Sequence, residues 1–159
     1  MEADNNDEEV RAEVEKFASS FGGASQGALD SLYASRLTAV EIYGTKDYRL
    51  DDASLTSLLD ALSTSQLYVR SIILKHHRIT SADAIVTKVI RDENRPEDRQ
   101  LSYLDLENND IDFKGIELLI NCFGDANSGL ETVNLSCNPL TTDAALLISD
   151  VVSTNNSPK

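Results

Sequence analysis

The stretch that decides the fold is Leu101-Ser-Tyr-Leu104-Asp-Leu106-Glu-Asn-Asn109-Asp-Ile111, which returns 29 residues later as Leu130-Glu-Thr-Val133-Asn-Leu135-Ser-Cys-Asn138-Pro-Leu140. Three later positions keep the same offset: Gly115, Leu119 and Phe123 are matched by Ala144, Ile148 and Val152. Agreement at eight positions indicates an internal repeat, and a repeat of this length predicts stacked, similar structural units.

Two weaker copies precede this pair. One contains Val69, Ile72, Leu74, His77 and Ile79, followed by Ala82, Val86 and Ile90. The other contains Leu37, Val40, Ile42 and Thr45 and, after a three-residue insertion, Leu50, Ser54, Leu58 and Leu62. The four copies divide the chain into units at residues 37–68, 69–100, 101–129 and 130–153.

Each unit changes its hydrophobic period part-way. Apolar residues at offsets 0, 3 and 5 predict a short strand, and later anchors four residues apart predict a helix. Helices are expected near 52–64, 80–91, 113–124 and 142–153. Side chains that can accept hydrogen bonds from first-turn amides mark three helix starts: Asp112, Thr141, and Thr80 or Ser81. Strand–helix–strand connections within one sheet are right-handed, so stacking the units should give a curved solenoid.

This pattern resembles the leucine-rich repeat, L-x-x-L-x-L-x-x-N-x-L, in its long ribonuclease-inhibitor-like class, over about residues 37–153. The resemblance implies an α/β fold. It would be a right-handed solenoid of about four strand–helix repeats with a parallel sheet on the concave side. It also implies that Asn109 and Asn138 stack as a ladder at the structural turn. His77 and Thr45 occupy the asparagine position in the earlier units and are expected to weaken the hydrogen bonding there.

The ends of the chain differ from the repeats. Residues 1–7 read as an acidic tail, and residues 8–36 as an N-terminal helical cap with a short second helix near 25–34. The segment 154–159 is polar and is expected to be disordered. The last unit is therefore expected to leave its flank uncapped and open to association.

Composition limits the classes of function. The 159 residues carry a net charge of −13, which disfavours binding to nucleic acid or to anionic membranes and favours a basic or neutral protein partner. No apolar run reaches the roughly 18–20 residues of a membrane span, and the acidic start is unlike a signal peptide. We therefore expect a cytoplasmic protein, with free thiols at Cys122 and Cys137.

Known catalytic and cofactor motifs are missing from the sequence. There is no phosphate-binding glycine loop and no nucleophile elbow, and His76 and His77 have no further metal ligands at the usual spacing. A structural turn role is favoured for His77 because it falls on the asparagine position. The sequence thus predicts a protein that is not an enzyme and uses no cofactor or metal.

Recognition is expected on the strands. Residues at offsets 2, 4 and 6 of each unit alternate with the buried anchors and should face the concave side. The candidate partner-binding residues on that face are Tyr43, Ile73, Lys75, Tyr103, Asp105 and Glu107. Tyrosine is enriched at binding hot spots, although these residues could equally be ordinary surface positions.

These observations favour a non-enzymatic protein–protein interaction module or scaffold. Proteins similar in repeat class serve as inhibitors, as cytoskeletal caps such as tropomodulin, and as scaffolds of cilia and flagella, so a cytoskeletal or flagellar setting is expected. One alternative is a regulator of an enzyme such as a small GTPase, because Ran GTPase-activating proteins contain repeats of this class. Another is the N-terminal part of a larger repeat assembly.

Overall fold

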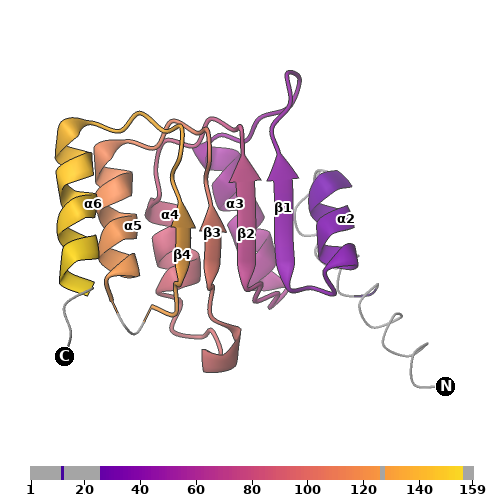
Figure 1. Ribbon diagram of the computed structural model, residues 1–159. Helices are drawn as coiled ribbons and strands as arrows, with labels where there is room; N and C mark the ends of the chain where they lie inside the picture. Colours follow the sequence, from indigo (N-terminus) through magenta and orange to yellow (C-terminus); the bar gives the residue numbers. More distant parts are fainter. Residues whose placement is uncertain (1–11, 13–25, 126–127, 156–159) are drawn as a thin grey trace.

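The computed structural model describes residue 12 and residues 26–125 and 128–155. It is an α/β structure with one sheet of four parallel strands in chain order (Figure 1). The strands are β1 (Ala39–Tyr43), β2 (Ser71–Lys75), β3 (Tyr103–Asp105) and β4 (Thr132–Asn134). Offset 3 of every unit is in register, since Val40 pairs with Ile72, Ile72 with Leu104, and Leu104 with Val133. The parallel α/β prediction is therefore confirmed.

Helices pack against one face of this sheet and enclose the core with it. They are α3 (Asp52–Thr64), α4 (Asp83–Ile85) with its wider continuation η1 (Val86–Ile90), α5 (Phe113–Phe123) and α6 (Thr142–Asn155). In Figure 1, α3 and α4 lie behind the strands, and α5 and α6 lie to the left of β4. A short turn of helix, η2 (Glu97–Arg99), precedes β3, and α2 (Gln26–Ala34) lies beside β1. Helices α2, α3 and α5 lie within one residue of their predicted bounds.

The two ends of the chain were only partly predicted. Helix α6 runs to Asn155, so the expectation of disorder is wrong for residues 154 and 155. Neither of these residues is a glycine or proline that would end a helix, and the first such residue after them is Pro158. The predicted tail at 1–7, the larger part of the predicted cap and residues 156–159 lie outside the described residues.

Side chains cap the helices largely where the sequence predicted. Asp112 Oδ1 accepts from the amide of Gly115 at 2.7 Å, and Thr141 Oγ1 accepts from the amide of Ala144 at 3.2 Å. Both predicted caps are thus confirmed. A further cap is Asp51, whose Oδ1 accepts from the amide of Ser54 at 2.9 Å.

The start of α4 was predicted in part. The Ser81 hydroxyl accepts from the amide of Asp83 at 3.1 Å, as expected of a residue that marks the helix start, but the helix begins at Asp83 and not near residue 80. The reason is a contact between units: Asp52 Oδ1 accepts from the amides of Thr80 and Ser81 at 2.8 and 3.1 Å, and Oδ2 accepts from the Thr80 hydroxyl. These bonds hold both residues against the start of α3, so the chain turns into helix only after them.

The strand anchors form the core between the sheet and the helices. Val40, Leu74, Leu104 and Leu106 are all completely buried. Two weaker anchors, Ser54 and Ile90, are only half-buried.

Leu140 departs from the repeat pattern. It is 45% exposed, although its counterparts Ile79 and Ile111 are completely buried. Those two are covered by the unit that follows each of them, and no such unit lies beside Leu140 among the described residues. The predicted anchor role of Leu140 is therefore wrong, and its exposure marks the open end of the sheet.

Helix α2 closes the opposite edge of the sheet. Ser31 Oγ accepts from the amide of Glu41 at 2.9 Å, and Ser35 Oγ accepts from the amide of Ala39 at 3.0 Å. The Ser35 hydroxyl also donates to the Ala39 carbonyl at 3.1 Å. Two serines one helical turn apart thus satisfy backbone groups of β1 that an edge strand would otherwise leave unpaired.

We predict that Leu106→Ala lowers the free energy of unfolding by about 2–5 kcal/mol, because it leaves a cavity under the sheet. Urea denaturation followed by circular dichroism measures this loss. Leu146→Ala is the matched control: that leucine is 60% exposed, and its removal should change stability by less than about 0.5 kcal/mol. Equal losses in the two variants would contradict the assigned core.

Candidate functional site

The face of the sheet turned away from α3, α5 and α6 carries the side chains that the sequence singled out. Strand residues alternate between buried and partly exposed along β1 and β2. The row at the middle of the sheet runs from Glu41 through Ile73 and Asp105 to Asn134. Its members are partly exposed except for Asp105, which is buried. We call this side the outward face. All six candidates lie on it: Tyr43, Ile73, Lys75, Tyr103, Asp105 and Glu107.

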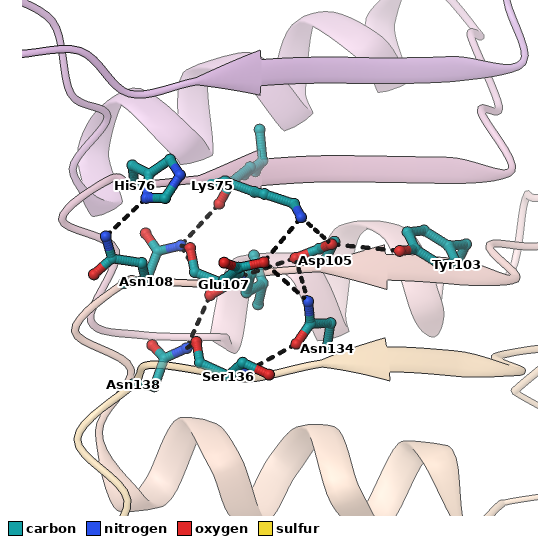
Figure 2. Close-up of polar contacts among 12 residues, drawn as sticks. Lys75, His76, Tyr103, Asp105, Glu107, Asn108, Asn134, Ser136 and Asn138 are labelled. Carbon is teal, nitrogen blue, oxygen red and sulfur yellow. Dashed lines mark hydrogen bonds and ion pairs between the residues drawn. The ribbon is translucent and has the colours of Figure 1, made fainter.

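Lys75 links two strands through ion pairs on the outward face (Figure 2). Its Nζ lies 2.9 Å from Glu107 Oε2 and 3.0 Å from Asp105 Oδ2. The hydrogen bond to Glu107, followed by the one to Asp105, raises the pKa of Lys75 above its ordinary value. The ammonium group is therefore charged at any physiological pH and is already neutralised within the protein.

Asp105 lies beneath this network and is only 1% exposed. Burial by itself would raise the pKa of its carboxyl group. The Glu107 amide at 3.0 Å, Lys75, and the side-chain amide of Asn134 at 3.1 Å more than offset burial, so the pKa lies below its ordinary value. The Tyr103 hydroxyl adds a fourth donor at 3.3 Å. Asp105 thus cannot touch a partner directly, as its prediction as an exposed contact residue required, and instead positions its neighbours.

Asn134 completes the network and was not among the predicted site residues. Its Oδ1 accepts from the Ser136 amide at 3.0 Å, as Asp105 Oδ1 accepts from the Glu107 amide one unit earlier. Both bonds form the same local turn at a strand end. The signal was present in the sequence, because an aspartate or asparagine stands at offset 4 of both later units.

The outward face therefore combines a rigid polar centre with accessible apolar groups. The charges of Lys75, Asp105 and Glu107 are satisfied by one another between the second and third units, and Asn134 of β4 donates to Glu107 (Figure 2). The most exposed candidate is Tyr43, at 51%, and it pairs in register with Lys75. Such an arrangement can hold large side chains in a fixed geometry.

The turns after the strands are held by side chains that bridge adjacent units. Asn109 Oδ1 accepts from the amide of Ile79 at 3.3 Å, and its Nδ2 donates to the carbonyl of Leu74 at 2.8 Å. Asn138 repeats this pattern one unit later, with Ile111 at 3.0 Å and Leu106 at 2.8 Å. We call this series of equivalent bonds, each of which joins a unit to the one before it, the ladder.

His77 takes the same position in the preceding junction, in agreement with the structural turn role that was favoured for it. It is 2% exposed; Nδ1 accepts from the amide of Leu50 at 3.1 Å, and Nε2 lies 3.1 Å from the carbonyl of Ile42. One ring acceptor and one ring donor thus replace the oxygen and nitrogen of an asparagine amide. Thr45 takes no such position: it is exposed, and its hydroxyl accepts from the Tyr48 amide at 3.1 Å.

One further row lies at the carboxyl ends of the strands. His76, Asn108 and Cys137 stand at the same repeat offset with positive φ angles of 64°, 54° and 59°. Asn108 Nδ2 and His76 Nδ1 are 2.7 Å apart. In the first unit this position is Gly44, where a Cβ would come within 1.9 Å of the His76 carbonyl oxygen. Of the two free thiols, that of Cys137 is exposed, whereas that of Cys122 is buried and burial raises its pKa.

Comparisons with known proteins yield no relative: no family model matches the chain, and neither a search of curated proteins nor one of solved structures finds a match. Among the described residues, no helix is both long and apolar enough to cross a membrane. Within the same residues, no cluster of three or more histidine, cysteine, aspartate or glutamate side chains could hold a metal ion.

We predict that Asp105→Asn lowers the free energy of unfolding by about 1–3 kcal/mol at pH 7, because it removes charge-assisted bonds from a buried site. Since the pKa of Asp105 is lowered by folding, its contribution is present above the ordinary value of about 3.9 and is lost as the pH falls through the folded value. The variant should therefore lose less stability in acid than the wild type does.

Urea denaturation at pH 7, 4 and 3 measures both effects. Asp110→Asn removes an exposed carboxylate from the same unit and serves as the control. If both variants follow the wild-type pH dependence, Asp105 does not make the assigned contribution.

Proposed function

We propose that this chain is a non-enzymatic interaction module that binds a protein partner through the outward face. We further propose that it is a leucine-rich repeat protein of the ribonuclease-inhibitor-like class, in which the outward face would be the concave side of a right-handed solenoid. Four strand–helix units in chain order, in register at equivalent positions, support this class. The bonds of Asn109 and Asn138 at equivalent offsets support it further.

The observation that carries the binding proposal is accessible aromatic and aliphatic surface beside a fixed polar network. Tyr43 is 51% exposed, and Ile73 and Tyr103 are partly exposed on adjacent strands. Tyrosine side chains contribute strongly at protein interfaces. Because Lys75, Asp105 and Glu107 hold one another in place, a partner would bind without the cost of ordering them.

The charge of the molecule supports a basic or neutral partner. At the outward positions of the described strands and their ends, Glu41, Asp105 and Glu107 are acidic and Lys75 is the one cation, and the whole chain carries −13. Association with a basic partner should then be faster at low ionic strength. Such a module would act in a cytoplasmic cytoskeletal or flagellar assembly, the setting of proteins with a similar repeat class.

The open end of the sheet supports a second contact. Leu140 is 45% exposed where the equivalent residues of earlier units are buried, and it belongs to the unit of β4, the last strand of the sheet. We propose that the last unit can associate with a further protein surface. Sedimentation velocity on wild type and Leu140→Ser tests this contact: concentration-dependent association should be lost in the variant, and a monomeric wild type at all concentrations would count against self-association there.

We predict that Tyr43→Ala combined with Ile73→Ser weakens binding of the partner by about tenfold or more, equal to about 1.4 kcal/mol, because it removes apolar contacts from the outward face. The partner is first identified by affinity capture and quantitative mass spectrometry. Its binding to each purified variant is then measured by calorimetry.

Tyr33→Ala is the matched control, because Tyr33 is 48% exposed on α2 and lies off the sheet. It should bind as the wild type does. The thermal midpoint of each variant must stay close to the wild-type value. Unchanged affinity in the double variant would place the binding site elsewhere.

A further inference from the structure

His77 is the one described member of the ladder that can gain a proton near neutral pH. It stands after β2, and both of its hydrogen bonds reach back to the first unit, at Leu50 and Ile42. The equivalent bonds of Asn109 and Asn138 come from side-chain amides, which do not titrate. The contact between the first and second units therefore differs chemically from the two that follow it.

The geometry assigns the protonation state that the fold requires. A backbone amide can only donate, so Nδ1 must accept from the amide of Leu50 and the single ring proton must lie on Nε2, toward the carbonyl of Ile42. A second proton on Nδ1 would point at the Leu50 N–H. The protonated ring would then leave a buried amide without an acceptor and place two donors against each other.

The surroundings of the ring also oppose the charged form. Burial is the largest cause of a lowered pKa for His77, and the neighbouring groups His76 and Arg49 lower it further. Only the Ile42 carbonyl favours the cation. No carboxylate of the described chain contributes to the pKa of this ring.

From this geometry we propose that His77 is a pH-sensitive joint, which holds the first strand and its loop, residues 39–50, to the rest of the sheet at neutral pH and releases them in acid. The loop after β1 carries the exposed Tyr48, and β1 ends on Tyr43. Acid would therefore loosen one end of the outward face while the third and fourth units keep their amide ladder. The joint does not depend on the proposed function, because it follows from the two ring contacts alone.

The direction of the effect follows from proton linkage. A histidine whose pKa is lowered by folding contributes stability that is present above its ordinary value of about 6.5, and that is lost as the pH falls through the folded value. Within that window, the equilibrium constant for opening rises up to about tenfold per pH unit. Carboxylates titrate near pH 4, and the chain contains only one other histidine, His76.

Hydrogen exchange followed by mass spectrometry at pH 7.5 and 5.5 tests the joint, with rates corrected for the intrinsic effect of pH. Protection of residues 39–50 should fall up to about tenfold per pH unit below 6.5, and protection of residues 104–120 should stay unchanged. In His77→Asn, which cannot titrate, the difference between the two pH values should vanish. In His76→Gln it should persist.

Loss of protection spread evenly over all units, or an unchanged pH effect in His77→Asn, would overturn the proposal. Should His77→Asn fail to fold, ring ¹⁵N chemical shifts of His77 in the His76→Gln variant give a direct measurement. They should show a neutral ring with its proton on Nε2 and a pKa below 6.5. Titration at or above 6.5, or a proton on Nδ1, would equally overturn it.

Discussion

The structure depends on hydrogen bonding at the turn that follows each strand. There the chain leaves the sheet, and a backbone amide and a carbonyl of the preceding unit remain buried without partners from the sheet. One side chain per junction supplies both missing bonds: His77, Asn109 and Asn138 in succession. Unpaired buried backbone groups cost about 1–3 kcal/mol each, so these contacts fix how neighbouring units lie against each other.

This constraint also explains why the outward face is rigid. Once the turns are aligned, offset 4 of successive strands falls in one row, which brings Asp105 beside Asn134. The i+2 amide bonds of both residues and the ion pairs of Lys75 then use the polar groups at the centre of the sheet. Tyr43, Ile73 and Tyr103 remain at least partly accessible beside these groups, and aromatic residues are enriched at protein interfaces.

Much of this fold could be predicted from periodicity. The repeat placed all four strands and located α3 and α5 within one residue, since apolar spacing reports directly on which side of an element is buried. Contacts between units were not predictable in this way. The start of α4 depends on Asp52 in the preceding unit, and Leu140 is exposed because no unit follows it among the described residues.

The candidate site shows the same limit. Alternation along the strands correctly placed six side chains on one face, but it could not show that Asp105 is buried by Lys75, Tyr103 and Asn134. Nor could it show that a histidine ring spans the same two backbone groups as an asparagine. The sequence favoured a structural turn role for His77 but also weaker hydrogen bonding there, because the pattern records residue types and not the positions of donor and acceptor atoms.

Ser31 of α2 and Ser35, which directly follows this helix, make the two edges of the sheet chemically different. Ser31 and Ser35 accept from the amides of Glu41 and Ala39 in β1, so a further strand could pair at that edge only by displacing them, whereas β4 has no strand on its outer side among the described residues. Two copies that paired through β4 would each use the sheet edge that is open among the described residues. Such growth closes after two subunits and cannot propagate into a fibre.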